Sequence, residues 1–222
     1  MSAFDPSRRS KLSRRDLARF EGDTLFQRIA RTVCAAECLP RKELYEAWEV
    51  ARRTRRRFRG GRVIDLACGH ALLAHLLLLL DDSSEAALAV DTRLPRSAAQ
   101  LGATLVAEWP RLAGRVTFVE AALASVEVRS SDLLVSCHAC GSLTDEVLNQ
   151  AIGAGARVVV LPCCHDKLEN DQGGLGGWLE PGLAIDVTRA ARLRGHGYTV
   201  HTQTIPSQIT PKNRLILAER RV

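Results

Sequence analysis

The stretch Gly61-Arg62-Val63-Ile64-Asp65-Leu66-Ala67-Cys68-Gly69-His70-Ala71, with the apolar run 72–80 behind it, decides the fold of this chain. The apolar residues around Asp65 do not alternate with polar ones, which predicts a short strand covered on both faces. A turn of small residues and then an apolar helix follow. Because backbone N–H groups are free in such a turn and at the helix N-terminus, this unit predicts a site for a nucleotide-like ligand.

A second acidic residue supports a ligand at this turn. The next apolar run, 86–90, ends at Asp91, roughly twenty positions beyond the turn, where a carboxylate accepts hydrogen bonds from ribose hydroxyls. The order Asp65-x-Ala67-x-Gly69-x-Ala71 resembles motif I of the Rossmann-like S-adenosylmethionine (SAM) methyltransferases, which reads acidic-x-Gly-x-Gly-x-Gly. Alanine replaces two of those glycines, and an ordinary strand–helix turn without a ligand is the alternative.

Composition limits the class of protein. With 222 residues and 46% hydrophobic content, the chain has enough apolar material for a buried core without disulfides. Residues 1–19 are polar and basic, unlike a signal peptide, and the apolar run 71–80 is far shorter than the roughly 20 residues that span a bilayer. The seven cysteines, an odd number, favour reduced thiols. We therefore expect a cytoplasmic protein without a membrane partner.

The formal net charge of +6 comes from the N-terminal segment. Residues 1–62 carry 17 Lys and Arg against 8 Asp and Glu, and the basic residues are densest over Arg52–Arg59. Such a cluster suits a polyanion, and RNA is the polyanion we expect in a cytosol. A solvated helix end is the alternative, since basic residues are favoured at helix C-termini.

The order of elements predicts the architecture. Apolar spacing predicts helices over 13–39 and 40–59, then strands alternating with helices up to the strand 157–161. We expect a basic α-helical cap (1–59) and a catalytic α/β domain (60–222). Strand–helix alternation indicates a doubly wound, mostly parallel Rossmann-like sheet. The last two strands, 198–205 and 214–219, are joined by a loop alone and predict an antiparallel pair at the sheet edge, as class I methyltransferases have.

Cysteines and histidines follow three strands that should be neighbours at the centre of this sheet. They are Cys68 after the first strand, Cys137-His138-Ala139-Cys140 after the fourth and Cys163-Cys164-His165 after the fifth. Because ligands bind outside the carboxyl ends of such strands, we expect all of them in one crevice. A histidine there exchanges protons near neutral pH.

Four interpretations of this crevice stay open. His138 or His165 could orient or deprotonate a methyl acceptor. A Cys163 thiolate could add to a base, since Pro162-Cys163 resembles an element of the cytosine-C5 methyltransferases. Cys137 and Cys140 could bind zinc together with residues 163–165. The thiols could also be packing groups without chemistry.

A longer pattern carries a further resemblance. His138-x-Cys140-Gly141-x-x-Thr144-Asp145, with Pro162-Cys163-Cys164-His165 about twenty residues later, resembles the catalytic domain of the eukaryotic tRNA 2′-O-ribose methyltransferases. It is also similar to the methyltransferase-like 25 proteins and to the methyltransferase domain of glutathione S-transferase C-terminal-domain-containing proteins. The resemblance covers about residues 60–222. It implies SAM as cofactor and RNA as substrate, with the ribose 2′-oxygen of tRNA as the specific case.

From the residues and the resemblance together we predict a SAM-dependent methyltransferase that acts on RNA with assistance from histidine. The alternatives are a protein or small-molecule acceptor, or a non-catalytic SAM-binding or zinc-containing interaction module. Oligomeric state is left open, and no metal ligand is assigned. The predicted catalytic residues are His138, His165, Cys140 and Cys163; the predicted cofactor residues are Asp65, Ala67, Cys68, Gly69, His70, Asp91 and Ser136.

Overall fold

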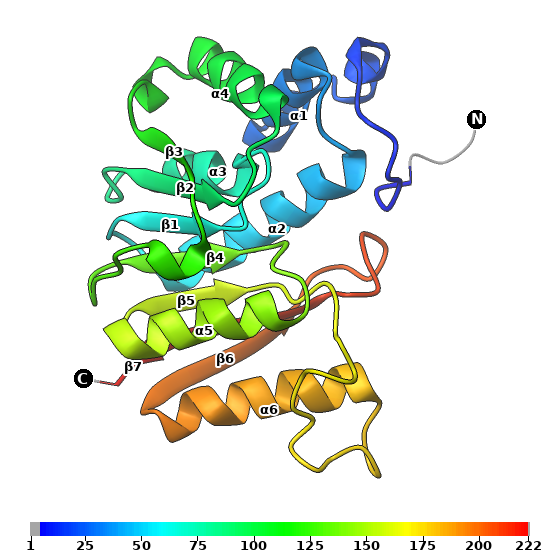
Figure 1. Ribbon diagram of the computed structural model, residues 1–222. Helices are drawn as coiled ribbons and strands as arrows, with labels where there is room; N and C mark the ends of the chain where they lie inside the picture. Colours follow the sequence, from blue (N-terminus) through cyan, green and yellow to red (C-terminus); the bar gives the residue numbers. More distant parts are fainter. Residues whose placement is uncertain (1–4, 222) are drawn as a thin grey trace.

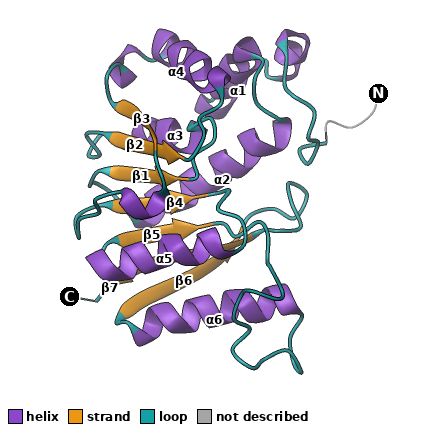
Figure 2. Ribbon diagram, viewed as in Figure 1, coloured by secondary structure: helices purple, strands orange, loops and turns teal. Residues whose placement is uncertain are grey.

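The chain forms a three-layer α/β structure in the computed structural model, which describes residues 5–221 (Figure 1, Figure 2). Residues 1–4 of the predicted cap and residue 222 of the predicted catalytic domain lie outside the described residues. The strands are β1 (Val63–Leu66), β2 (Ala87–Asp91), β3 (Val116–Glu120), β4 (Leu133–Ser136), β5 (Arg157–Val160), β6 (Tyr198–Thr204) and β7 (Arg214–Arg220). The helices are α1 (Leu25–Ala36), α2 (Arg41–Arg57), α3 (Leu72–Leu80), α4 (Arg96–Glu108), α5 (Ser142–Ala154) and α6 (Pro181–Gly195), with short 3₁₀ helices η1 (Arg14–Arg19), η2 (Pro110–Leu112) and η3 (Leu123–Ser125).

Across the described residues the sheet has seven strands in the order β3-β2-β1-β4-β5-β7-β6. Strands β1 to β5 run parallel, whereas β7 lies antiparallel between β5 and β6. This arrangement confirms the predicted α/β class, including the antiparallel C-terminal pair. The chain order reverses between β1 and β4, so the carboxyl ends of these two strands flank the switch point where ligands bind in open α/β sheets.

Each face of the sheet is covered by its own helices. Val63 and Val135 belong to a hydrophobic cluster with α1, α2, α3 and α4, while Ile64 and Leu134 pack with α5 and α6 on the other face. Neighbouring residues of one strand thus enter opposite cores, because side chains alternate along a strand. This two-sided burial is the reason that the strand sequences show no polar face.

The N-terminal helices share a core with the sheet. Leu12, Phe20 and Ile29 lie in the same cluster as Val63 and the residues of α3. Helix α1 packs against α4 and helix α2 against α3. The apolar core is therefore continuous across the predicted boundary at 59/60, which itself stays a prediction.

Local sequence sets two helix boundaries. Helix α4 ends at Glu108, because Pro110 disfavours helical backbone at Trp109, where φ is −127° and ψ is 85°. Helix α6 begins at Pro181, because the Glu180 carboxylate accepts hydrogen bonds from two backbone N–H groups of its first turn. Within residues 5–221, every helix falls short of the length and apolar content that crossing a bilayer requires.

Candidate functional site

The turn between β1 and α3 keeps the backbone path of a glycine-rich loop although two of its glycines are absent. The angle φ is +55° at Ala67, +51° at Gly69 and +57° at Ala71, and these are the three glycine positions of the motif that the sequence resembles. The left-handed conformation costs an L-residue about 1–2 kcal/mol, and Ala67 and Ala71 both adopt it.

The space beside Gly69 is open. A Cβ atom built on Gly69 would meet no atom within 4 Å, so the space above the turn is free. The Gly69 N–H donates to Oδ2 of Asp91 over 3.0 Å, which ties the end of β2 to the turn after β1. Backbone without a side chain, beside a carboxylate, allows a ligand to approach the main chain closely.

A cavity of about 410 Å³ lies beside this turn and is called the turn cavity below. Its volume falls in the range of sites for small molecules and cofactors. Six of the seven predicted cofactor residues line it, whereas Ser136 does not. The lining residues are Leu39, Glu43, Ala47, Asp65, Ala67, Cys68, Gly69, His70, Leu72, Leu73, Asp91, Pro95, Cys137, His138 and Leu143.

Ser136 is not among the residues that line the turn cavity. Its side chain is buried, and its hydroxyl oxygen accepts a hydrogen bond from the Ala139 N–H over 3.2 Å. Ser136 thus supports the loop 137–141 from beneath rather than facing the cavity.

The turn cavity is acidic. Asp65 is 2% exposed, and burial raises the pKa of its carboxyl to about 7, helped by the nearby Asp91 and opposed by a hydrogen bond from the Ala74 N–H. Burial also raises the pKa of Glu43, which His138 opposes. Three carboxyl groups around one cavity favour a ligand that carries positive charge.

His70 contributes a neutral group to the same cavity. Its Nε2 atom lies 2.9 Å from the Ser97 hydroxyl, and burial lowers the pKa of the imidazole. Near neutral pH this histidine is therefore a hydrogen-bonding group rather than a cation.

A second cavity of about 670 Å³, called the adjacent cavity below, borders the first. Glu43 and His138 line both cavities, so the half-buried His138 side chain stands at the boundary between them. The remaining residues of the adjacent cavity come from the N-terminal segment, from the loop after β5 and from the loop before β7. They are Ser7, Arg9, Pro40, Lys42, Glu46, Cys163, Cys164, Ile209, Thr210, Pro211 and Lys212.

Sequence reasoning missed the acidic residues of α2. Glu46 is 2% exposed; one carboxylate oxygen lies 2.9 Å from the Lys42 ammonium, and the other has no hydrogen-bond partner among the described residues. Glu43 lies one turn away on the same helix. The signal was present in the sequence as an acidic pair at i, i+3 in the first half of a helix whose second half is basic.

The cysteines divide into two groups. Cys68 and Cys137 line the turn cavity, and burial raises the pKa of both thiols, so they stay neutral there. Cys140, Cys163 and Cys164 gather outside it, with the Cys140 and Cys163 sulfurs 3.0 Å apart. Burial and the neighbouring thiols also raise the pKa of Cys163. Nothing in this environment favours the thiolate that a nucleophilic Cys163 requires.

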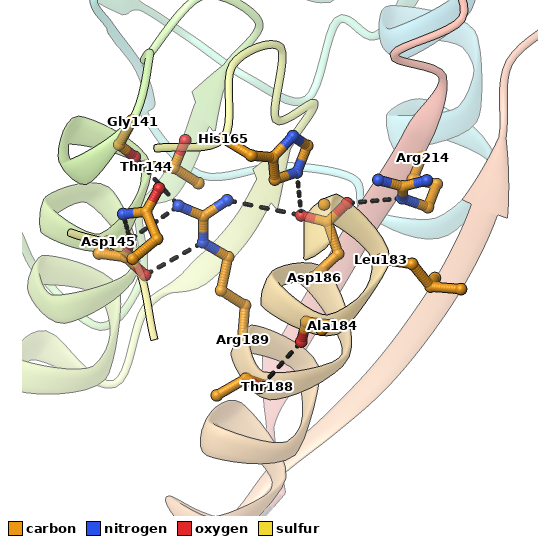
Figure 3. A network of polar contacts seen from close by, with 12 residues as sticks. Gly141, Thr144, Asp145, His165, Leu183, Ala184, Asp186, Thr188, Arg189 and Arg214 are labelled. Carbon is orange, nitrogen blue, oxygen red and sulfur yellow. Dashed lines mark hydrogen bonds and ion pairs between the residues drawn. The ribbon is translucent and has the colours of Figure 1, made fainter. Parts of the chain in front are cut away.

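His165 lies outside both cavities, and the prediction of a single crevice is wrong for this residue. Its side chain is 3% exposed, and its Nε2 atom lies 2.8 Å from Oδ1 of Asp186 on α6 (Figure 3). The other Asp186 oxygen accepts from Arg214 Nε over 2.6 Å. The imidazole is therefore held in a polar network with Asp186, and His165 is not among the residues that line either cavity.

That network joins four segments of the chain (Figure 3). The buried Arg189 side chain pairs with Asp145 of α5 over 2.7 Å and donates to the Gly141 carbonyl over 3.0 Å. It also lies 3.4 Å from Asp186. Gly141 ends the loop 137–141 that carries His138, and His165 ends the loop 161–165 that carries two cysteines. The network therefore fixes these two loops relative to α6 and β7.

The arginine cluster lies at the other end of α2. Arg55 is buried and pairs with Asp81 over 3.2 Å, and Arg57 pairs with Glu219 over 2.9 Å. At 1.5 Å per residue, Arg56 is about 21 Å along the helix from Lys42 at the adjacent cavity. Helix α2 ends just before β1 begins, so the cluster lies at the amino edge of the sheet. Its contact with RNA stays a prediction.

Comparisons with known proteins agree with this geometry. A protein family described as a methyltransferase domain matches residues 42–171, a range that crosses the predicted domain boundary. No curated protein matches the sequence. Similar solved structures include an O-methyltransferase family protein from Burkholderia thailandensis, with 19% identity over 92% of this chain and a TM-score of 0.50. They also include TrmK from M. capricolum in complex with S-adenosyl-homocysteine, with 12% identity over 77% of this chain and a TM-score of 0.51.

The pyocyanin biosynthetic protein PhzM is also similar, with 17% identity over 95% of this chain and a TM-score of 0.54. The chain spans 62% of the Burkholderia protein, 66% of TrmK and 62% of PhzM. At these identities the likeness shows a common fold and leaves the substrate to the site itself.

Proposed function

The chain belongs to the methyltransferase domain family, and we propose that it transfers the methyl group of SAM to RNA, with the ribose 2′-oxygen of tRNA as the specific acceptor. The observation that carries this proposal is the pair of cavities that meet at His138. The turn cavity has the size and charge for the cofactor, and the adjacent cavity opens beside it for the acceptor.

The residues of the turn cavity fit SAM. Asp91 would accept hydrogen bonds from the ribose hydroxyls of the cofactor, and the open space at Gly69 supports close approach of the ligand to the turn. Asp65 would hold the ammonium group of the cofactor, since a carboxylate in an apolar pocket favours a cationic partner. When bound, SAM supplies a methyl group on a positively charged sulfur, which is open to attack by an acceptor oxygen or nitrogen.

His138 would act on the acceptor. A ribose hydroxyl loses its proton as the methyl group arrives, and an imidazole at the boundary of the two cavities is placed to take that proton. The rest of the rate enhancement would come from holding the acceptor in line with the methyl group. His165, Asp186 and Arg189 would hold the loops in position without touching the acceptor.

Basic residues at the adjacent cavity support an RNA acceptor. Arg9 and Lys212 are exposed at its edge, and Lys42 lies within it. Cations around a cavity of this size suit the phosphates that flank a target nucleotide. The resemblance of the His138 and Cys163 loops to the tRNA enzymes supports the same substrate class.

Incubation of the protein with methyl-labelled SAM, cell RNA and cell protein tests the proposal. We expect label in the RNA fraction, in nucleosides that carry the methyl group on the ribose, and at least about 100-fold less label with the His138→Ala variant. Label in the protein fraction or in small molecules would instead identify one of the other acceptor classes and contradict the RNA assignment.

A double variant tests where the RNA lies. Because Arg9 and Lys212 would each neutralise one phosphate, Arg9→Gln with Lys212→Gln should lower RNA affinity and reduce the slope of log K against log salt by about 1.5. The control is Arg52→Gln with Arg56→Gln, which removes the same charge from the arginine cluster. If only the control pair lowers affinity, RNA binds the amino edge of the sheet and contact at the adjacent cavity is disproved.

A further inference from the structure

Three cysteines from two loops bring their sulfur atoms together. The Sγ atoms of Cys140, Cys163 and Cys164 all lie within 4.8 Å of one another. Cys140 follows β4 and the other two follow β5, and these strands are parallel neighbours whose ends are in register at Ser136 and Val160. Within residues 5–221, no other trio of His, Cys, Asp or Glu side chains is grouped in this way.

We propose that these three thiols bind a soft divalent cation, with Zn²⁺ as the ion the site fits, and leave its fourth coordination position to a ligand from the adjacent cavity. Zinc–sulfur bonds of about 2.3 Å in a tetrahedral site place the sulfurs about 3.8 Å apart, so the observed cluster needs only small side-chain movements. Three protein ligands and one open position are typical of catalytic rather than structural zinc sites.

The loops that carry the ligands are held in place independently of any metal. The Gly141 N–H donates to the Cys164 carbonyl over 3.2 Å, which joins the two loops directly. Arg189 holds Gly141 from the other side, and Asp186 holds His165 (Figure 3). A site on loops supported in this way is preorganised, which lowers the cost of gathering three ligands.

The charge around the three thiols and their exposure to solvent also suit a metal ion. A divalent cation with three thiolates carries a net charge of −1, and Lys42 lines the adjacent cavity together with Cys163 and Cys164. Cys140 and Cys164 are exposed, which provides a path for the ion. A metal ion that binds cysteine side chains stabilises their thiolate form.

The place of the site gives it a consequence for the reaction, which rests on the proposed function. Cys163 and Cys164 line the adjacent cavity together with His138. A hydroxyl that entered this cavity and took the fourth position would have a lower pKa, and its proton would pass to His138 or to water. The metal would then prepare the acceptor oxygen for the methyl group. The metal binding itself rests on the three thiols alone.

Titration of the reduced protein with Co²⁺ tests the metal site, because thiolate-bound cobalt has intense sulfur-to-metal absorption. We expect one cobalt per chain, displaced by one equivalent of Zn²⁺. Cys163→Ser and Cys164→Ser should each weaken cobalt binding by about 100-fold or more, while the control Cys68→Ser, which alters a thiol of the turn cavity, should bind like the unmodified chain. Circular dichroism of each variant verifies that it is folded.

Three outcomes would overturn the proposal. The first is the absence of stoichiometric cobalt binding by the reduced protein. The second is unchanged cobalt binding by folded Cys163→Ser. The third is thiolate-to-cobalt absorption that Zn²⁺ does not remove. If the reduced protein does not bind cobalt but loses two hydrogens in air through a Cys140–Cys163 bond, the thiols are a redox pair instead. Stoichiometric metal binding without methyl transfer would contradict the proposed function and leave the metal site standing.

Discussion

Replacing His138 by alanine is expected to lower methyl transfer by about 10²–10⁴-fold, the usual contribution of a positioned acid–base group, and to leave SAM affinity within about threefold of the unmodified chain. The reason is its position: the half-buried imidazole borders both cavities, whereas the charged partners that we propose for the cofactor, Asp65 and Asp91, line the turn cavity. Loss of the side chain removes the proton acceptor and keeps the carboxylates in place.

Single-turnover rates with saturating SAM and RNA measure this effect, and equilibrium binding of S-adenosylhomocysteine measures cofactor affinity separately. His138→Gln is an informative companion, because glutamine keeps a polar group at the boundary but cannot take a proton. The matched control is His196→Ala, which removes an exposed imidazole at the C-terminal end of α6. A normal rate for folded His138→Ala would remove the role that we propose for this residue.

The strands and the turn were predictable from the sequence because their information is local. Burial on both faces of the sheet makes the strands continuously apolar, and the small residues at 67, 69 and 71 mark the left-handed turn even where alanine stands for glycine. The antiparallel ending followed from the short loop between the last two strands. Each of these features depends on residues that are close together in the chain.

His165 was mispredicted because the direction of its side chain depends on residues far away in sequence. The strand end places its backbone near the site, but its imidazole pairs with Asp186, which Arg214 holds from the other carboxylate oxygen. No local pattern at residues 162–165 indicates these partners. A prediction that a residue follows a strand therefore locates the residue without locating its functional group.

The arginine cluster illustrates a different limit. The sequence showed the charges but not which edge of the sheet they reach, although the link from Arg57 through Gly60-Gly61 into β1 held that information. A helix that leads directly into a parallel strand ends at the amino edge, opposite the ligand site. The same reasoning places the first turn of α2, with Glu43 and Lys42, beside the cavities.

Asp65 gives the protein without bound cofactor an unusual dependence of stability on pH. Burial raises the pKa of this carboxyl from 3.8 to about 7. In the unfolded chain Asp65 loses its proton near pH 4, whereas the folded protein keeps it until about pH 7. The free energy of unfolding should therefore fall as pH rises through this window, by about 4 kcal/mol in total, and level off above it.

Urea unfolding of the unmodified chain and of Asp65→Asn at several pH values isolates this contribution, since the other titrating groups are common to both. The asparagine oxygen can still accept the hydrogen bond from the Ala74 N–H, so the variant should lose the charge and keep the packing. Asp65→Asn should gain stability relative to the unmodified chain between about pH 4 and pH 7 and keep that gain at higher pH. A difference that does not vary with pH would contradict the raised pKa.

Cofactor binding should depend on pH in the opposite direction. A cationic group beside Asp65 favours the ionised carboxylate, so binding of SAM below about pH 7 must release a proton from this residue. SAM affinity of the unmodified chain should then rise with pH by at most tenfold per unit up to about pH 7, over the same window in which the Asp65 contribution to stability falls. Asp65→Asn should bind SAM weakly, and its SAM affinity should not rise with pH in this way. The ionised Asp65 carboxylate thus destabilises the protein without cofactor, and bound SAM would stabilise the same carboxylate. Calorimetry in buffers of different ionisation enthalpy would detect the released proton.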